Sequence, residues 1–261
     1  MRPYLSHEHP IRFAHRGSRV LWPENTMVAF QGTADLGYRY IETDVHVSRD
    51  GRVVVFHDDR LERLTDGTGK VWDRDWDDLR SLDAAHRFDP DRGFPLRGTG
   101  VGIPLLEEAL AAFPDCLFNL DLKQAGIEEA VAAEAARLDA EERVLVGAFR
   151  DRRVRRFRRA SGGRVATAAG PAEVLAAMAA ARRQRPASGP ADAYQVPPSA
   201  GGIAVVGPRF VEAAHAGGKQ VHVWTINDPA EMHRLLDLGV DGIVTDRPDV
   251  LNAVLEERSA R

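Results

Sequence analysis

The sequence is nearly free of cysteine and has no long apolar run. Cys116 is the single cysteine among 261 residues, which excludes an intramolecular disulfide and an all-cysteine metal site, and its apolar neighbours predict a core position. No segment approaches the ~20 apolar residues of a membrane-spanning helix, and residues 1–10 lack the apolar core of a signal peptide. We therefore expect a cytoplasmic protein.

The sequence also has no marked excess of either charge. Its 35 Lys and Arg against 39 Asp and Glu give a formal net charge of -4, so no global field attracts nucleic acid or an anionic membrane. One local exception is the segment from Arg150 to Arg159, which holds seven arginines. Val154 and Phe157 give that segment only a thin apolar face, which favours a solvated outer helix over a membrane-docking one.

What the chain does contain is a regular alternation of short apolar runs and helical patterns. Such alternation is typical of βαβ units and a parallel sheet. The predicted strands are Ile11 to His15, Tyr40 to Asp44, Leu117 to Lys123, Val144 to Phe149, Arg164 to Ala168, Ala193 to Val196, Gln220 to Thr225 and Gly242 to Thr245. A length near the ~250 residues of a (β/α)8 barrel makes a TIM barrel spanning 1–261 the best interpretation, with an open doubly wound sheet as the alternative.

Helix signals agree with this fold class. Helices are predicted to begin near Glu24, Leu105, Ile127, Asp151, Pro171, Pro208, Pro229 and Pro248. Proline suits a first helical turn, where its missing N–H is not needed. Gly37 and Gly239 fall where a helix must end before the next strand.

The run from Arg52 to His57 does not fit as a ninth barrel strand. Asp50-Gly51 just before it is a two-residue hairpin signal, so the run is expected to fold back antiparallel, with Asp44 opposite His57. The turn-rich stretch that follows, about 60–102, is expected to be an insertion above the barrel. Its glycines lack the spacing of a dinucleotide-binding loop.

Carboxylates gather at two predicted strand ends. Glu42 and Asp44 are two apart in a strand, so both side chains point to one face, and Asp121 ends the next barrel strand. Adjacent carboxylates repel unless a cation or proton lies between them, and an oxygen set suits magnesium, calcium or manganese better than zinc. The alternative is that all three are solvated strand-end acids.

Histidines and cations accompany these acids. His15 and His57 are candidates for an acid/base pair, since imidazole titrates near neutrality. Arg16 and Lys123 offer the positive charge that a phosphate needs, although they could also only balance the acids. His46 and His222 are more readily explained as structural, and Glu24-Asn25-Thr26 as a helix cap.

Taken in order, several short motifs resemble the glycerophosphodiester phosphodiesterase family from residue 11 to about 250. They are His15-Arg16-Gly17, Pro23-Glu24-Asn25-Thr26, Glu42-Thr43-Asp44-Val45, Asp50-Gly51, His57-Asp58, Leu64-Thr65-Asp66-Gly67-Thr68-Gly69, Asn119-Leu120-Asp121-Leu122-Lys123, Val223-Trp224-Thr225-Ile226-Asn227 and Gly242-Ile243-Val244-Thr245-Asp246-Arg247-Pro248. Single pieces are weak signals, but their order and spacing are highly specific.

The resemblance implies hydrolysis of glycerophosphodiesters to glycerol 3-phosphate and an alcohol with one divalent cation. It implies that a glycerol hydroxyl attacks phosphorus first, giving a cyclic phosphate that water then opens. Carried over by position, the metal ligands would be Glu42, Asp44 and Asp121, the acid/base pair His15 and His57, the phosphate-binding residues Arg16 and Lys123, and the pocket wall Trp224. One departure is Asp121, where the family commonly has glutamate; the shorter side chain must move closer or reach the metal through water.

Two other functions stay open. A lysophospholipase D or sphingomyelinase D-like activity resembles this chemistry on the same barrel, and a long acyl chain would need an exposed apolar groove near Trp22, Trp72 or Trp224. A binding module that keeps the fold without turnover is the alternative from another class. No catalytic position of the family pattern is missing, which favours an active enzyme over a binding module.

Overall fold

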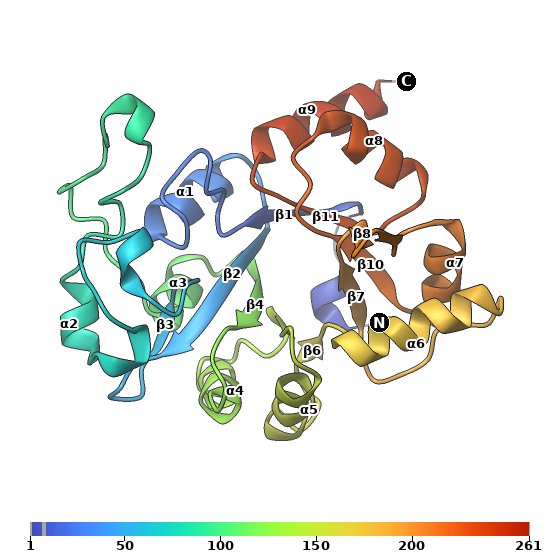
Figure 1. Ribbon diagram of the computed structural model, residues 1–261, viewed down its shortest axis with the longest axis horizontal. Helices are drawn as coiled ribbons and strands as arrows, with labels where there is room; N and C mark the ends of the chain where they lie inside the picture. Colours follow the sequence, from blue (N-terminus) through green and yellow to red (C-terminus); the bar gives the residue numbers. More distant parts are fainter. Residues whose placement is uncertain (1, 7–8, 261) are drawn as a thin grey trace.

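The computed structural model describes residues 2–6 and 9–260, and within them eight parallel strands form a barrel ringed by helices (Figure 1). In order around the barrel, these strands are β1 (Ile11–His15), β2 (Tyr40–Val47), β4 (Leu117–Leu122), β5 (Val144–Gly147), β6 (Ala166–Thr167), β7 (Ala193–Val196), β10 (Gln220–Val223) and β11 (Gly242–Thr245). Strand β11 pairs with β1, and a parallel bridge between Ala168 and Ala193 joins β6 to β7. The barrel is therefore closed, which confirms the predicted fold over an open sheet.

Helices follow the strands much as the sequence predicts. They are α1 (Met27–Asp35), α2 (Trp76–Arg80), α3 (Leu106–Ala112), α4 (Glu128–Arg137), α5 (Asp151–Ala160), α6 (Pro171–Arg182), α7 (Pro208–Ala216), α8 (Pro229–Asp237) and α9 (Pro248–Ser259), with 3-10 turns η1 (Pro3–Leu5), η2 (Leu61–Arg63), η3 (Val71–Asp73) and η4 (Pro90–Arg92). All four predicted prolines occupy a first helical turn. Gly37 and Gly239 both have a φ of 80°, the left-handed conformation expected after a helix. No helix among the described residues is long and apolar enough to cross a bilayer.

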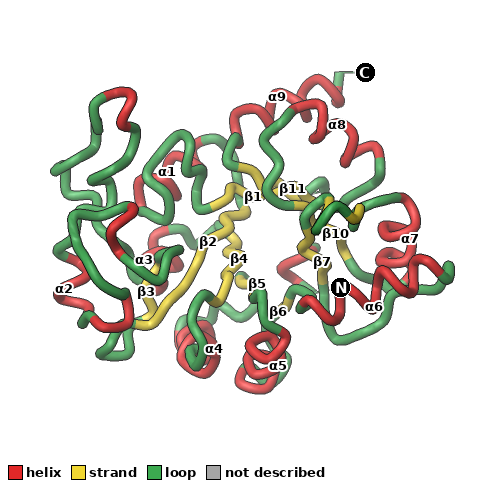
Figure 2. The backbone as a smooth tube through the Cα atoms, in the orientation of Figure 1, coloured by secondary structure: helices red, strands yellow, loops and turns green. Residues whose placement is uncertain are grey.

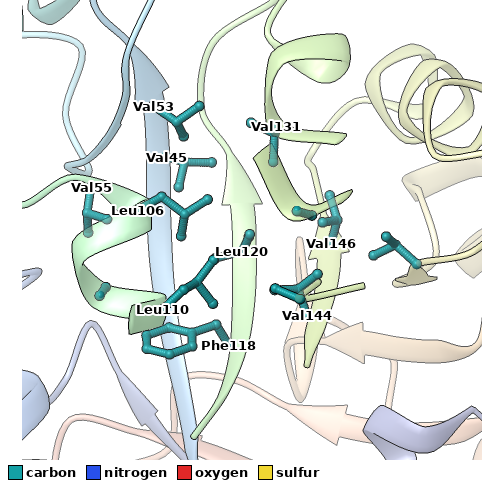
Figure 3. Close-up of a cluster of buried hydrophobic side chains, with 14 of the residues drawn as sticks. Val45, Val53, Val55, Leu106, Leu110, Phe118, Leu120, Val131, Val144 and Val146 are labelled. Carbon is teal, nitrogen blue, oxygen red and sulfur yellow. The ribbon is translucent and has the colours of Figure 1, made fainter. Parts of the chain in front are cut away.

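Alternation along each strand divides the apolar core into two layers. On β4, Phe118, Leu120 and Leu122 face outward and pack with α3 and α4, as Figure 3 shows for part of this cluster. Leu117 faces inward, into a cluster that also contains Phe13 and Tyr40. Because successive side chains of a strand point to opposite faces, the inward set continues as every second residue toward the carboxyl end.

The N-terminal turn η1 closes the amino end of the barrel. Tyr4 and Leu5 are buried in the inner cluster, and the Tyr40 hydroxyl donates a 2.7 Å hydrogen bond to the Tyr4 carbonyl. Gln220 Nε2 donates to the carbonyl of Leu5 at 2.9 Å. This end of the barrel is filled by side chains, so the opposite end is where a ligand can enter.

Strand β3 (Val53–Val55) pairs antiparallel with β2 as predicted, but the register differs by one residue. Val45 lies opposite Val55, and the Phe56 N–H donates to the Asp44 carbonyl at 3.0 Å, so Asp44 faces Phe56 rather than His57. The cause is the turn, which has three residues instead of two. Ser48 and Arg52 bracket it, and Gly51 inside it has a φ of 87° that glycine adopts without strain.

The predicted insertion lies beside the barrel rather than above it. Figure 2 shows its loops and short helices on the far side of the β2–β3 ribbon. It packs there around a small apolar cluster in which Phe56, Leu61, Val71 and Leu79 are buried. The sequence does not reveal this placement because it depends on the outer face of β3, which supplies Val54 to the same cluster.

A second, shorter ribbon was not predicted. Strands β8 (Ser199–Ala200) and β9 (Ile203–Ala204) form an antiparallel hairpin between β7 and α7. Gly201 and Gly202 occupy its turn, both with positive φ. Two residues per strand carry too little alternation to be recognised as strands in the sequence.

Candidate active site

One cavity of about 730 Å³ opens at the carboxyl ends of the barrel strands. The residues that the sequence predicts for the site all line it: His15, Arg16, Glu42, Asp44, His57, Asp121, Lys123 and Trp224. In barrel enzymes this end carries the chemistry, because loops from every strand meet there.

Strand register brings the charged residues together. Side chains two apart share a face, so Glu42 and Asp44 on β2 point inward together, as do Asn119 and Asp121 on β4. Glu42 is the Cα partner of Asn119, and Asp44 is the partner of Asp121. His15 at the end of β1 lies beside Glu42 in the same way.

His15 is held between two carboxylates. Its Nδ1 lies 2.7 Å from Asp246 Oδ1, and its Nε2 lies 3.8 Å from Glu42 Oε2. Burial alone would lower the pKa of His15, but Glu42 and Asp246 outweigh it and the pKa is raised. Hydrogen bonds from His15 and Asn227 keep the pKa of Asp246 low despite its burial, so this carboxylate can only accept, and His15 Nδ1 must donate.

His57 is anchored in the same manner. Its Nδ1 lies 2.5 Å from Asp58 Oδ1. Burial would raise the pKa of Asp58, but hydrogen bonds from His57 and Arg63 hold it well below its usual range. Both histidines therefore have Nδ1 bound to an ionised carboxylate, which fixes each ring and assigns proton exchange to Nε2.

Two of the three candidate metal ligands bind an ammonium group. Lys123 Nζ lies 2.9 Å from Asp44 Oδ1 and 2.6 Å from Asp121 Oδ2. Burial would raise the pKa of Asp44, but Lys123 and Arg16 lower it. Burial and the neighbouring Asp44 raise the pKa of Glu42 to about 7, and burial also raises that of Asp121. The charges of Lys123 and Arg16 thus keep Asp44 ionised but do not offset the burial of Glu42 and Asp121.

These residues fit a hard divalent cation by donor type. Oxygen atoms from Glu42, Asp44 and Asp121 line one wall, and Asn119 Oδ1 beside them is buried with no hydrogen-bond partner. Among the described residues, however, no three His, Cys, Asp or Glu side chains are already grouped as a metal-holding cluster. A cation would bind here only with Lys123 Nζ displaced from between Asp44 and Asp121.

Arg16 lies in a tight turn that follows β1. Its φ of 53° and the φ of 69° at Gly17 reverse the chain, and the Arg16 N–H donates to Glu42 Oε2 at 3.1 Å. A Cβ on Gly17 would come within 2.8 Å of Ala29, so glycine is required for both conformation and space. The guanidinium of Arg16 bonds Glu24 Oε1 at 2.8 Å.

Several residues of the site were not assigned from the sequence. Only Thr26 caps α1, through a bond from the Ala29 N–H. Glu24 instead pairs with Arg16 and Arg63, and Asn25 donates to Asp44 Oδ2 at 2.9 Å. Asp246, one residue beyond β11, occupies a strand-end position that could have signalled it. Arg63 could not be found this way, because it comes from the insertion.

The remaining candidates lie outside the cavity or line its edge. His46 is buried and stacks against Trp72 at 5.7 Å between ring centroids, and His222 is fully buried in the inner layer. Trp22 lies against Gly32 of α1. Trp224 lines the cavity and makes an edge contact with Phe149 at 5.5 Å.

On α5, Val154 and Phe157 are buried against the barrel. Arg153 binds the carbonyls of Leu122 and Lys123, and Arg158 pairs with Glu173. The apolar residues of this helix thus contribute to the core, in keeping with an outer helix of the barrel.

A closed (β/α)8 barrel with two carboxylate-anchored histidines, buried acids and two cations in one cavity is an enzyme site suited to acid/base chemistry on an anionic substrate. Comparison with known proteins agrees. The model of the glycerophosphoryl diester phosphodiesterase family matches residues 15–250, and the chain belongs to this family.

Two curated relatives and one solved structure illustrate the similarity. The chain is 41% identical to a Mycobacterium tuberculosis protein named probable glycerophosphodiester phosphodiesterase 2, over 98% of this chain and 94% of that protein. It is 34% identical to a glycerophosphodiester phosphodiesterase of Bacillus altitudinis, over 94% and 98% of the two chains. A crystal structure of a glycerophosphodiester phosphodiesterase from Agrobacterium tumefaciens superposes with a TM-score of 0.76 at 26% identity, covering 93% of this chain and 99% of that one.

Proposed function

We propose that this enzyme hydrolyses glycerophosphodiesters to sn-glycerol 3-phosphate and an alcohol, using His15 and His57 as an acid/base pair and one divalent cation. The observation that carries the proposal is the convergence in one cavity of two histidines whose Nδ1 atoms are both held by carboxylates. Family membership supports the same reaction.

Proton transfer falls to the two Nε2 atoms. One imidazole accepts the proton of the attacking glycerol hydroxyl as its oxygen bonds to phosphorus, and the other donates a proton to the alcohol as the phosphorus–oxygen bond breaks. The cyclic phosphate formed in this way is opened by water with the two roles exchanged. Asp246 and Asp58 hold the rings in the required tautomer and act as positioning residues.

Positive charge for the phosphate comes from Arg16 and Lys123. Both line the cavity, and Arg16 is held there by Glu24. Lys123 Nζ, which would leave Asp44 and Asp121 when a cation binds, would then be available to the phosphate. Positive groups of this kind stabilise the charge that builds on phosphoryl oxygens in the transition state. Trp224 forms a wall of the same cavity.

Glu42, Asp44 and Asp121 would hold the cation, which we propose to be magnesium, calcium or manganese. When bound, it would supply Lewis-acid stabilisation of the phosphoryl oxygens. Its binding would also favour the ionised form of Glu42, whose pKa is raised to about 7 by burial and by the neighbouring Asp44.

The test is release of sn-glycerol 3-phosphate from glycerophosphocholine and glycerophosphoethanolamine, before and after EDTA and after adding back each cation. We expect EDTA to abolish turnover and at least one of the three cations to restore it. Glu42→Gln should need a higher concentration of that cation, while the matched control Glu257→Gln, at an exposed position of α9, should behave as wild type.

Full turnover in EDTA would contradict the role of the cation. Failure to cleave any glycerophosphodiester with any added divalent cation would contradict the proposed activity itself.

A further inference from the structure

The insertion extends the side chain of Arg63 toward the active site. Its guanidinium makes two paired contacts, one with each of two carboxylates. Arg63 Nε and Nη2 lie 2.5 and 3.0 Å from the two oxygens of Asp58. Nη1 and Nη2 lie 3.0 and 2.7 Å from the two oxygens of Glu24. A planar guanidinium matches a carboxylate in this paired way, which fixes distance and orientation together.

Each of the two carboxylates also holds a side chain that lines the cavity. Asp58 Oδ1 lies 2.5 Å from His57 Nδ1, and Glu24 Oε1 accepts from Arg16 Nη1 at 2.8 Å. His57 and Arg16 line the cavity, whereas Arg63 does not. Arg63 is therefore set back from the substrate, and one carboxylate separates it from the proposed acid/base histidine and from the proposed phosphate-binding arginine.

Both carboxylates depend on this shared cation. Burial would raise the pKa of Asp58, but bonds from His57 and Arg63 lower it. Burial would also raise the pKa of Glu24, which Arg63 and Arg16 lower in the same way. The side chain of Glu24 is only 5% exposed, so water cannot replace a lost partner, and a buried charge with incomplete pairing is costly.

Arg63 itself is placed by the fold of the insertion. It ends η2, whose first residue, Leu61, is fully buried in the apolar cluster of the insertion. The Leu61 N–H donates to the Gly69 carbonyl at 3.0 Å, and Arg87 Nε donates to the Glu62 carbonyl at 2.9 Å. The position of the guanidinium thus follows from contacts within the insertion and not from the barrel strands.

We propose that Arg63 is a positioning residue of the reaction, through which the insertion holds the side chains of His57 and Arg16 at the same time. This inference rests on the proposed function. Proton transfer at His57 Nε2 needs a ring fixed by Asp58, and contact with the phosphate needs an Arg16 guanidinium fixed by Glu24. Because Arg63 joins the two carboxylates, the insertion is a working part of the active site.

The test measures kcat and KM for glycerophosphocholine in three variants. A group that orients a catalytic side chain typically contributes about ten- to a hundredfold to activity. Asp58→Asn should lower kcat by that factor with little change in KM, because it disturbs His57 alone. Glu24→Gln should mainly raise KM, because it loosens Arg16. Arg63→Ala should combine the two defects.

Two further readouts separate positioning from a general loss of structure. When Arg63→Ala is added to Asp58→Asn, the fall in kcat should be smaller than the product of the two single effects, since residues that act through one contact are not additive. The side chain of Arg63 is 43% exposed, so guanidinium ion at millimolar concentration can enter the space that Arg63→Ala leaves. It should restore part of kcat, whereas ammonium at equal ionic strength should not.

Arg80→Ala is the matched control. Arg80 lies on α2 of the same insertion, and its exposed side chain pairs with Asp77 outside the cavity. It should keep wild-type kcat and KM. An equal loss of kcat in Arg80→Ala and Arg63→Ala would overturn the inference, because any disturbance of the insertion would then have the same effect.

The other failures are distinct. If the wild type cleaves glycerophosphocholine and Arg63→Ala has wild-type kinetic constants, the inference is wrong and the proposed function stands. The same holds if its loss multiplies in full with that of Asp58→Asn and guanidinium restores nothing. If Arg63→Ala does not fold, Arg63→Lys decides: it keeps the charge without the fork, so kcat should fall about tenfold, and wild-type constants would overturn the inference. If the wild type cleaves no glycerophosphodiester, the proposed function falls and this inference falls with it.

Discussion

The two ends of the barrel interior are built on the same strands and the same faces, but they differ in chemistry. At the amino end most inward residues are apolar, as with Phe13 on β1 and Tyr40 on β2, while Gln220 and His222 on β10 are buried polar residues among them. Two residues further along, these strands place His15 and Glu42. The apolar layer is filled and closed by η1, whereas the charged layer opens into the cavity.

Two histidines show how strongly the environment within the barrel shifts the pKa of an imidazole. His15 lies among carboxylates, and its pKa is raised. Burial at the amino end lowers the pKa of His222 to about 4. The difference indicates that one end of the barrel serves catalysis and the other stability, and substitutions should separate the two.

The largest effect on catalysis is expected for His15→Ala. Loss of a general acid or base should reduce kcat by about 10³-fold, while the melting temperature changes little because the side chain borders the cavity. Steady-state kinetics and thermal unfolding measure both. The control His233→Ala, on α8 away from the cavity, should keep wild-type kcat. A large fall in melting temperature for His15→Ala would show that the carboxyl end of the barrel also contributes strongly to stability, which would contradict the assignment of the two ends.

Phe13→Ala should have the opposite effect. Phe13 is fully buried and packs against Tyr40 and His222, with ring centroids 5.2 and 4.8 Å away. Its truncation should lower the free energy of unfolding by about 3–5 kcal/mol, measured by urea denaturation, with kcat of the folded protein unchanged. Val28→Ala, at an exposed position, should change stability by less than about 0.5 kcal/mol. A kcat loss comparable to that of His15→Ala would contradict the assignment of catalysis to one end of the barrel and stability to the other.

The pH dependence of stability should reveal His222. Its folded pKa of about 4 lies below the ordinary histidine value of 6.5, so the unfolded chain binds a proton first as pH falls. The resulting stability is present above pH 6.5 and is lost between there and pH 4, by about 3 kcal/mol for this group. In His222→Gln this part of the pH dependence should be absent in denaturation curves recorded across the interval. If the free energy of unfolding changes with pH by the same amount in both proteins, His222 does not cause this part of the pH dependence.

Asp246→Asn should reduce kcat by about ten- to a hundredfold with little change in KM. The amide can still accept from His15 Nδ1, but its lost charge no longer stabilises the imidazolium. Asp241→Asn is a matched control, because Asp241 also bonds a histidine, His215 Nε2 at 2.8 Å, outside the cavity. Equal kcat losses in both variants would argue against a positioning role for Asp246.

The smallest effect is expected for Asp121→Glu. The longer side chain should reach a cation more directly, so the concentration for half-maximal binding, measured by calorimetry, should fall several-fold. The matched substitution Asp35→Glu, on α1 outside the cavity, should leave that concentration unchanged. Weaker binding in Asp121→Glu would show that the shorter aspartate suits the site as it is.

Much of this arrangement could be predicted from the sequence. The alternation of strands and helices gave the barrel, and spacing of two within Glu42-Thr43-Asp44 placed both carboxylates on one face. The hairpin was recognised, but its register was not, since a three-residue turn and a two-residue turn share the same Asp50-Gly51 signal. His57 nevertheless lines the cavity.

One wall of the cavity is lined by apolar side chains, which the sequence did not predict. Val174, Met178 and Val196 come from two elements and read as ordinary core residues. Only closure of the barrel shows that they border a cavity instead of filling one. Arg63 could not be predicted as a residue of the site for a similar reason, because the insertion that carries it lies beside the barrel (Figure 1).

The most direct test follows glycerophosphocholine by phosphorus-31 NMR with wild-type enzyme and His15→Ala. The wild type should convert the diester signal to that of sn-glycerol 3-phosphate with one choline released for each phosphate, and the variant should leave the diester intact over the same time. Appearance of phosphocholine and glycerol, or equal conversion by His15→Ala, would contradict the catalytic assignment.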